Sequence, residues 1–313
     1  MSEKSLYLQI QPSIIKHLGI KMYQKAADVI AEFVANAWDA DATQVDITID
    51  DTTKTITVCD NGDGMTYNEC QNKYLQVGRD RRKSLQTDLT RRQRKVMGRK
   101  GIGKFAGFGI SSSIHVKSIS KSTDSTLDYP DEAPNVATEF ILNLDDFESN
   151  SHIEKHEIET LRADSPTNES CGTSITLNKV SANLSDVAIN EITKGLARRF
   201  LQTENNADFV ITVNKNPAKI LFNENKEFIF PRDLSDEEKQ KFNLDNIEQA
   251  EDGDWAVTSI PNFGQVKWRI AFTEETIKEV EMRGIAIFAR NKLAQKPFFF
   301  KRVGIIKFQA DKV

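Results

Sequence analysis

Long apolar runs and secretion signals are missing from this sequence. No apolar stretch approaches the roughly 20 residues that a helix needs to cross a bilayer, and the mean hydropathy is −0.48. The N-terminal segment MSEKSLYLQIQPSI has no basic region followed by an apolar one, so it does not resemble a secretory signal. We therefore expect a cytoplasmic protein with no membrane partner.

Cysteine is also scarce. The three cysteines, Cys59, Cys70 and Cys171, form an odd set with neither a CxxC pair nor the His/Cys spacing of a metal site. A disulfide framework and a zinc site are therefore not expected. We interpret the cysteines as small, partly buried residues.

Charge is plentiful but unevenly distributed. The net charge is −4, yet residues 77–104 hold eleven Lys or Arg against two Asp or Glu, and residues 124–169 hold thirteen Asp or Glu against two Lys or Arg. We interpret both segments as solvated insertions. The basic one lies beside a glycine-rich motif, so attraction of a polyanion is a competing interpretation there.

Hydrophobic periodicity predicts the order of helices and strands. Apolar residues recur at three- and four-residue spacing between residues 14 and 40, which predicts a helix. Residues 45–50 and 53–60 alternate apolar and polar side chains and predict a hairpin, with Asp51 and Thr52 at its turn. Helices and strands continue to interleave without a regular βαβ rhythm. The pattern predicts an α+β sandwich in which helices cover one face of a mixed sheet.

Length and pattern together predict two domains. A chain of 313 residues can bury two cores, and a helix predicted over residues 187–201 opens the second half. We place the boundary between residues 185 and 186, with a smaller α+β domain over residues 186–313. The chain ends on a strand-like stretch, which favours an N-terminal fragment or a subunit with a separate effector. A natural end on an edge strand is the alternative.

The first chemical motif lies on the predicted N-terminal helix. Glu32 and Asn36, in EFVANAWDA, are four residues apart and share one face. A carboxylate there can orient and deprotonate a water, and an amide oxygen one turn on can help hold Mg²⁺. Taken alone, this pair is more typical of a helix surface.

The second motif, DNGDGM, follows the second predicted strand. Asp60 is an acceptor at the strand end, suited to the exocyclic amino group of adenine, and the glycines after it allow close approach to the backbone. A calcium loop of the EF-hand type is excluded because Gln71 stands at the twelfth position, where that loop needs Glu.

Two further motifs complete the set. Residues 98–106, GRKGIGKFA, resemble a Walker A loop in spacing, but Phe105 stands where Ser or Thr would hold Mg²⁺. The remaining interpretation is a set of backbone N–H groups at a helix N-terminus that cradles phosphates, with Lys104 adding charge. Gly172 and Thr173 open a predicted strand, where the hydroxyl could reach Asp60 and the base through water.

Together these four elements resemble the GHKL superfamily, which includes gyrase-type topoisomerases, ninety-kilodalton heat-shock chaperones, histidine kinases and MutL-type repair ATPases. The match rests on their order and spacing over residues 14–180. The resemblance implies a Bergerat fold over residues 1–185 that binds ATP and Mg²⁺, with Glu32 as general base, Asn36 as Mg²⁺ ligand and Asp60 as adenine contact. The other nucleotide-binding positions that it implies are Asp39, Gly62, Gly64, Met65, Gly98, Gly101, Ile102, Gly103, Lys104, Phe105 and Thr173.

The flanking sequence favours one branch of the superfamily. Histidine kinases usually place a phosphoacceptor histidine before this domain, and only His17 precedes Asn36 here. A β-rich segment follows Thr173, as in the MORC-, MutL- and heat-shock-chaperone-like branch, whose transducer domain sends a basic side chain to the γ-phosphate. Lys292 is our candidate for that catalytic side chain. The other candidates are Arg290, Lys296, Lys215 and Lys219.

The resemblance implies a Mg-dependent ATPase with slow turnover, in which nucleotide-driven lid closure and homodimerisation gate an effector protein or nucleic acid. Two alternatives stay open: a nucleotide-sensing or nucleic-acid-binding module in which ATP is a structural ligand, and chaperone-like protein remodelling. The basic segment 77–104 is interpreted first as a lid over ATP and second as a nucleic-acid patch. No aromatic residue lies between Arg91 and Lys95, which argues against base stacking.

Overall fold

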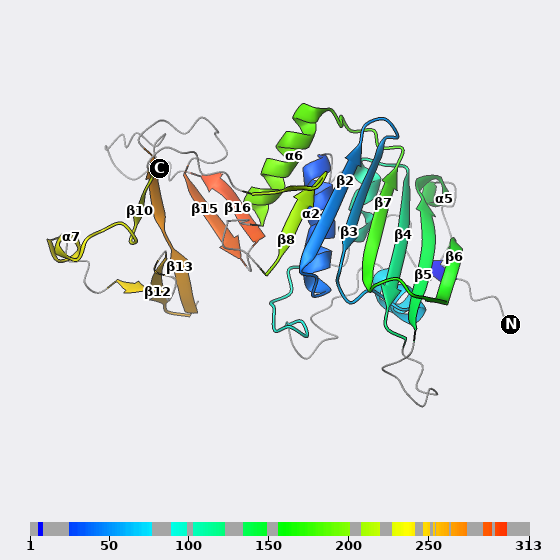
Figure 1. Cartoon of the computed structure of the whole chain (residues 1–313), viewed down its shortest axis with the longest axis horizontal. Coiled ribbons are helices and arrows are strands. Elements are labelled where there is room, and N and C mark those ends of the chain that lie inside the picture. The colour runs from blue at the N-terminus through cyan, green and yellow to red at the C-terminus, as the bar shows by residue number, and fades with distance from the viewer. Residues whose placement is uncertain are drawn as a thin grey trace. The chain divides into compact units, whose positions relative to one another are not determined.

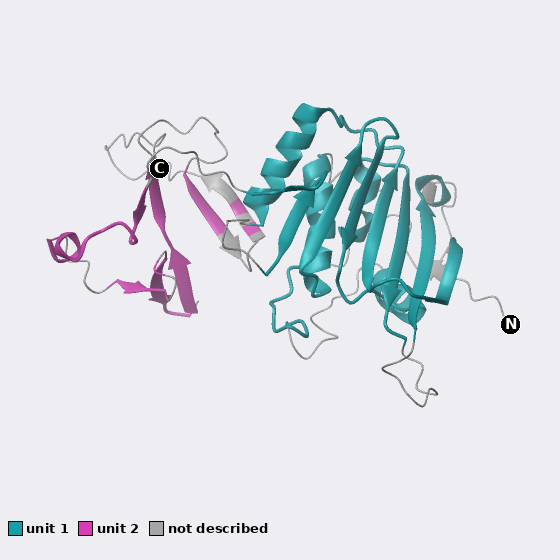
Figure 2. Ribbon diagram, in the orientation of Figure 1, with its two compact units in different colours: residues 1–220, 290–292 teal, residues 221–289, 293–313 magenta. Residues whose placement is uncertain are grey.

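The computed structural model describes residues 6–8, 25–76, 89–98, 103–122, 134–148, 156–200, 208–219, 227–241, 247–250, 253, 255–262, 264–273, 284–289 and 292–298 (Figure 1). The chain divides into two compact units (Figure 2). Unit 1 comprises residues 1–220 and 290–292, and unit 2 comprises residues 221–289 and 293–313.

Unit 1 is built on one mixed sheet of nine strands. Their order is β1-β6-β5-β4-β7-β3-β2-β8-β9. The bounds are β1 (Leu6–Leu8), β2 (Gln44–Asp50), β3 (Thr55–Asp60), β4 (Ser113–Ser120), β5 (Asn135–Asn143), β6 (His156–Thr167), β7 (Gly172–Asn178), β8 (Val210–Val213) and β9 (Asn216–Pro217). The neighbours pair antiparallel except β2 and β8, which are parallel. The predicted hairpin of β2 and β3 and the α+β class are confirmed.

Alternation of side chains decides which face of this sheet is buried. In β2, Val45, Ile47 and Ile49 are buried and the residues between them are not. In β3, Ile56 and Val58 continue the same face. Successive side chains of a strand point to opposite faces, so this pattern gives the sheet one apolar face for helices to cover.

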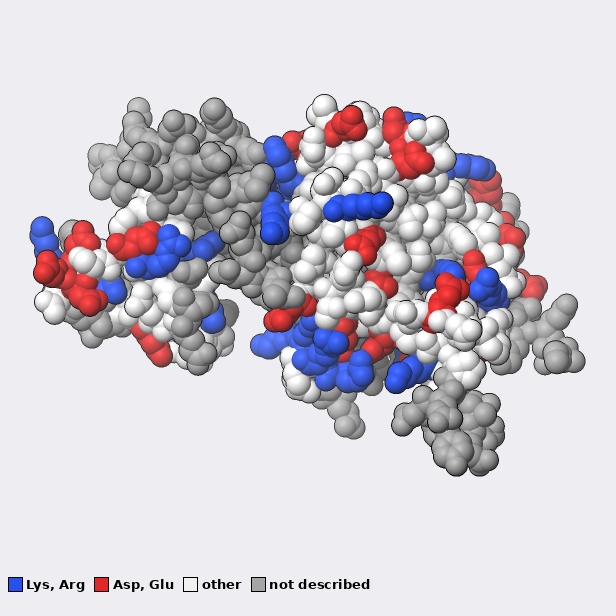
Figure 3. Space-filling model, viewed as in Figure 1, with Lys and Arg blue, Asp and Glu red and all other residues white. Residues whose placement is uncertain are grey.

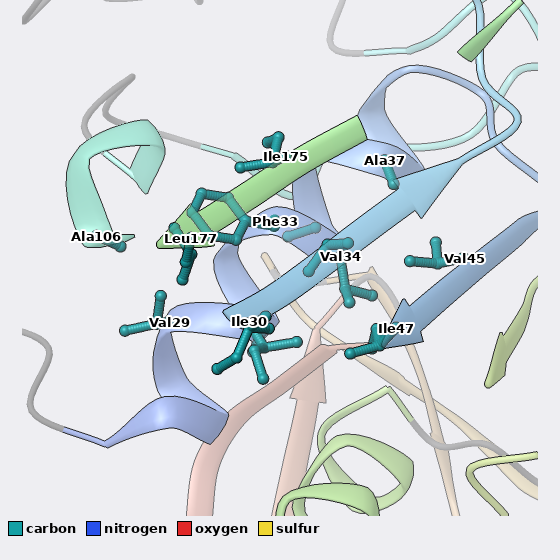
Figure 4. Packing of buried hydrophobic residues seen from close by; sticks show 14 of the residues in the cluster. Val29, Ile30, Phe33, Val34, Ala37, Val45, Ile47, Ala106, Ile175 and Leu177 are labelled. Atoms are coloured by element: carbon teal, nitrogen blue, oxygen red, sulfur yellow. The ribbon is translucent and has the colours of Figure 1, made fainter. Parts of the chain in front are cut away.

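Helix α2 (Ala26–Asp39) supplies most of that cover. Figure 4 shows Val29, Ile30, Phe33, Val34 and Ala37 of α2 packed with residues of β2 and β7. Fully burying one such side chain contributes roughly 1.5–3 kcal/mol. Apart from Ala27, the residues of α2 that are not buried are polar and form one edge of an otherwise apolar helix.

Two other helical segments extend this layer. The glycine-rich motif enters a 3-10 helix, η2 (Gly103–Gly109), which contacts α2 and β4. Helix α6 (Asp186–Arg199) contacts α2 and β8, burying Ile192 and Leu196, and Arg199 Nη1 lies 2.6 Å from Asp28 Oδ1 of α2. The shorter segments of unit 1 are α3 (Tyr67–Glu69), the π-helix η1 (Cys70–Tyr74) and α5 (Leu144–Glu148).

The packing of α6 moves the structural boundary. The sequence placed a boundary between residues 185 and 186, whereas compact unit 1 continues to residue 220. The reason is tertiary: α6 lies against α2, and β8 extends the sheet beside β2 with Val45 opposite Ile211. The helix predicted over residues 187–201 therefore belongs to the core of the first unit.

Unit 2 contains small sheets. Its elements are β10 (Glu227–Phe230), α7 (Asp236–Lys241), β11 (Glu248–Gln249), β12 (Ala256–Ile260), β13 (Gly264–Trp268), β14 (Ile270–Thr273), β15 (Ile285–Ala289) and β16 (Lys292–Phe298), of which Lys292 alone is assigned to unit 1. The sheets are β10-β14, β11-β12-β13 and β15-β16, and the strands of β10-β14 and β11-β12-β13 pair antiparallel. Phe228 faces Phe272 across β10 and β14, with ring centroids 6.2 Å apart. This unit combines helix and strand, as the sequence predicted for the second half.

Within the part of the chain that the structure describes, no helix combines the length and apolar character needed to cross a membrane. The cysteines are all free, with Cys70 buried in η1 and Cys59 exposed on β3.

Candidate functional site

Asp60 ends β3 and is held there by two backbone donors. Its Oδ1 accepts hydrogen bonds from Gly62 N at 2.8 Å and from Thr173 N at 3.3 Å. Burial raises the pKa of Asp60 to about 6, although these two bonds act in the opposite direction. The sheet register places Asp60 directly opposite Thr173 of β7, so the second and fourth sequence motifs meet at this strand end.

The glycines beside Asp60 are required by the protein's own backbone. A Cβ on Gly62 would lie 2.6 Å from Ala40 O, and one on Gly64 would lie 1.8 Å from Ile119 O. Gly64 also has a φ of +67°, and a Cβ on Gly172 would lie 2.1 Å from Asp60 O. The sequence assigned Gly62 and Gly64 to the approach of a base. The structure adds that the tight turn after β3 cannot close without them.

Replacing Gly64 by alanine is expected to destabilise the protein by at least about 2 kcal/mol, because the new Cβ meets a carbonyl in a left-handed backbone conformation. Gly195 provides the matched control. It lies within α6, where a Cβ would meet only Ala27 Cβ at 3.7 Å, so Gly195→Ala should be neutral or stabilising. Chemical denaturation of both variants tests this, and equal stabilities would contradict it.

Ser118 belongs to the same cluster, although sequence reasoning did not select it. Its hydroxyl lies 2.9 Å from Thr173 Oγ1 and accepts a hydrogen bond from Met65 N at 2.9 Å. Ser118 is fully buried. The sequence does contain a signal for it: in β4, Ser118 follows Ile114 and Val116 on the inward phase, so a hydroxyl stands where the alternation predicts an apolar residue.

Glu32 and Asn36 lie on the polar edge of α2. Both are half-buried, while Phe33, Val34 and Ala35 between them are buried. Glu32 is also in close contact with η2, because a Cβ on Gly103 would lie only 2.7 Å from Glu32 Oε2. The first and third sequence motifs therefore meet at this edge.

Asp39, one turn further along α2, contacts the chain just before the glycine-rich loop. Its two carboxylate oxygens accept hydrogen bonds from Met97 N at 2.7 Å and Gly98 N at 2.9 Å. The sequence assigned both Asp39 and Gly98 to nucleotide binding. In this structure they bind each other, so Asp39 positions the start of the loop and Gly98 N–H is already satisfied.

Lys104 is oriented into the protein. It is 6% exposed, and its Nζ donates to Gln76 O at 2.5 Å beside the rings of Tyr74 and Phe105. A phosphate contact from Lys104 would have to reach the remaining Nζ–H donors of this nearly buried side chain. Phe105 itself is a core residue, 1% exposed. Gly101 and Ile102 lie outside the described residues.

The basic residues predicted to reach the γ-phosphate fall into two groups. Lys292 opens β16, and its side chain lies outside what the structure describes, as do Arg290 and the side chain of Lys296. Lys215 and Lys219 are exposed beyond β8. Asp60 is level with Ile211 of β8, and Lys215 lies in the turn after Val213, at least roughly 7 Å along the strands from Asp60.

The backbone closes the site between helix and sheet. Asp63 N donates to Ala40 O at 2.9 Å, joining the turn after β3 to the end of α2.

A sequence match agrees with this arrangement: residues 23–160 match the family described as histidine kinase-, DNA gyrase B-, and HSP90-like ATPase. The chain carries a GHKL-type ATPase domain. The matched range contains Glu32 and Asp60, and β7, with Thr173, follows it.

The similarity to one relative covers more of the chain than this domain. The chain is 31% identical over 219 residues to a protein of Herpetosiphon aurantiacus that carries a provisional designation as the type II restriction enzyme HgiDII. The aligned region is 69% of this chain and 33% of that protein. The chain thus spans about a third of the length of the relative that it matches.

The chemistry of α2 fits a magnesium ion bound mainly by a nucleotide. Within the described ranges, no group of three or more His, Cys, Asp or Glu is arranged to hold a metal. Mg²⁺ is usually held by one or two protein oxygens together with water and substrate phosphates. The half-buried amide of Asn36, one turn from the Glu32 carboxylate, can supply such an oxygen.

Proposed function

We propose that this chain binds Mg-ATP and hydrolyses it slowly, and that nucleotide-driven lid closure and dimerisation gate an effector or nucleic acid. The observation that carries the proposal is the convergence of four separated motifs. Glu32 lies against Gly103 of η2, and Asp60 accepts a hydrogen bond from Thr173 N. Membership of a GHKL-type family supports ATP as the ligand.

Each polar side chain has a role that suits its surroundings. Glu32 would orient and deprotonate the attacking water. Asn36 would hold Mg²⁺, which when bound would neutralise phosphate charge. Asp60 would accept the adenine amino group, with Ser118 holding Thr173 and the Met65 amide beside it. The γ-phosphate would be contacted by Lys292, with Arg290 and Lys296 as alternatives.

A second candidate is a nucleic-acid-binding module in which ATP is a structural ligand. It is favoured by the designation of the relative as a restriction enzyme and by the basic segment over residues 77–104. The two functions share the binding site but differ in turnover. Measuring phosphate release therefore separates them.

The proposed function predicts that ATP hydrolysis requires Mg²⁺ and that the triphosphate changes the assembly state. Phosphate release should stop when EDTA replaces Mg²⁺. The mass in solution, measured by light scattering after size exclusion, should double with a non-hydrolysable ATP analogue and not with ADP. An unchanged mass would remove dimerisation from the proposal, and tight ATP binding without Mg-dependent turnover would favour the structural-ligand module.

A further inference from the structure

Residues 89–98 form a closed turn that carries three exposed cations, and we call this segment the basic turn. An antiparallel bridge joins Leu89 to Lys95, and Thr90 N donates to Arg94 O at 2.8 Å. Gln93 has a φ of +62°, which lets the chain reverse. The exposed cations are Arg91, Arg92 and Lys95.

Carboxylates at the end of α2 hold this turn in place. Asp41 is 5% exposed, and its oxygens accept from Thr90 Oγ1 at 2.5 Å and from Arg92 N at 3.1 Å. Asp39 accepts from the last two amides of the turn, as described above. These carboxylates are directed inward to backbone and hydroxyl donors, so they do not cover the exposed cations.

Arg94 and Trp38 form a second attachment. The Arg94 guanidinium lies 4.5 Å from the Trp38 ring centroid and donates to Ala42 O at 2.5 Å and Asp208 O at 2.8 Å. Trp38 Nε1 in turn donates to Lys95 O at 3.1 Å. Binding through a turn that is already fixed costs less conformational entropy than binding through a mobile one.

The outward face of the turn is positive. Figure 3 shows Lys and Arg side chains gathered at the lower edge of unit 1, where Figure 1 draws this turn below α2. Arg91 has an acidic partner there, since its Nη2 lies 2.5 Å from Asp63 Oδ1, with both side chains at least half exposed. Such an exposed pair contributes little and can be exchanged for another anion.

The position of the turn separates it from the triphosphate. Glu32 lies seven residues before Asp39 in α2, roughly 10 Å along the helix axis. With adenine at Asp60 and the γ-phosphate at Glu32, as proposed above, the basic turn lies at the adenine end. The nucleotide's own phosphates therefore do not account for its three exposed cations.

We propose that Arg91, Arg92 and Lys95 form a docking surface for the phosphate backbone of double-stranded DNA. Arginine forks match phosphate oxygens, and the turn presents no exposed aromatic or apolar side chain for stacking on bases. The designation of the relative as a restriction enzyme favours DNA as the polyanion. The inference rests on the proposed function only for where the nucleotide lies.

The test measures binding of the full chain to a fluorescent DNA duplex at several salt concentrations. The variant Arg91→Gln/Arg92→Gln/Lys95→Gln should lose at least about tenfold in affinity, and its salt slope should fall by about 2–3, because each phosphate contact contributes about 0.9. The matched control removes three exposed lysines elsewhere in unit 1: Lys54, Lys73 and Lys194, each changed to Gln. This control should bind within about twofold of the wild type.

Preorganisation is tested separately with Asp41. Asp41→Ala keeps all three cations but removes the acceptor for Thr90 and Arg92, so affinity should fall several-fold while the salt slope changes little. Asp41→Asn, which keeps one oxygen acceptor, should recover part of the affinity. Thermal unfolding of each variant shows whether the fold is retained.

The outcomes distinguish this inference from the proposed function. Equal losses in the triple variant and in the lysine control would show that net charge alone binds DNA, and would overturn the inference. A wild type that binds ATP but not the duplex would also overturn the inference. A triple variant with unchanged DNA affinity but a changed mass in solution would overturn it too, and would indicate that the basic turn contacts an acidic protein surface. A wild type that does not bind ATP would refute the proposed function itself.

Discussion

Replacing Glu32 by alanine is expected to lower the rate of ATP hydrolysis about 10²- to 10⁴-fold while ATP affinity stays nearly unchanged. This is the range that a positioned general base contributes, and the adenine contacts at Asp60 are not touched by the change. Phosphate release and equilibrium binding of ATP, measured on the same preparations, give the two quantities.

Glu32→Gln is the informative companion variant. Glu32 Oε2 lies close to η2, since a Cβ on Gly103 would be only 2.7 Å from it. Alanine at position 32 leaves space there, whereas glutamine keeps the shape of the side chain without its basicity. Equal loss of turnover in the two variants supports a base. Normal turnover in Glu32→Gln would instead assign Glu32 to packing against the glycine-rich loop.

Replacing Asp60 by asparagine is expected to separate binding from stability. The asparagine amide presents donors where adenine also donates, so ATP affinity should fall about 10- to 100-fold, the worth of one hydrogen bond to a charged group. The unliganded protein should become more stable at neutral pH, because a partly buried negative charge is removed. Asp46→Asn, exposed on β2, is a control expected to change neither quantity.

The pH dependence gives the sign of this stability effect. Burial raises the pKa of Asp60 from 3.8 to about 6, so the folded protein binds this proton more tightly than the unfolded chain does. The resulting stability is fully present below pH 4 and is lost as pH rises through 6. Asp60→Asn should lack this loss and exceed the wild type by about 1–2 kcal/mol at pH 7.5, after allowing for solvent at a half-buried group.

Thermal unfolding of both proteins at pH 5 and pH 7.5 measures this difference. The gap between Asp60→Asn and the wild type should widen with pH. A gap that is constant, or that narrows, would mean that Asp60 does not titrate in this window. Adenosine, which has no phosphate to titrate here, is the suitable ligand for following binding over the same pH range.

Much of the fold could be predicted from local pattern. The alternation in β2 and β3 sets which side chains are buried, and the helical spacing in α2 predicts its apolar face. These features depend on residues within one or two turns or strand repeats of each other. The extent of unit 1 could not be predicted in this way, because α6 joins it through contacts with α2 and β8.

The site shows the same division between local and long-range information. Sequence spacing placed Glu32 and Asn36 on one face of a helix, and the ordered motifs indicated a GHKL-type domain, which the family match bears out. Ser118 was missed because its partners, Met65 and Thr173, lie more than 50 residues away on either side. Nothing in the local pattern of β4 names them.

The sequence by itself therefore determined the kind of domain and indicated the candidate residues for its chemistry, because both depend on residue type and short spacing. The tertiary structure decided how these residues are used in this conformation. Gly98 N–H is taken by Asp39, Lys104 Nζ is turned to Gln76 O, and Asp41 fixes the basic turn. Hydrogen-bonding groups bind whichever partner the fold brings near, and that choice is made only when distant segments pack together.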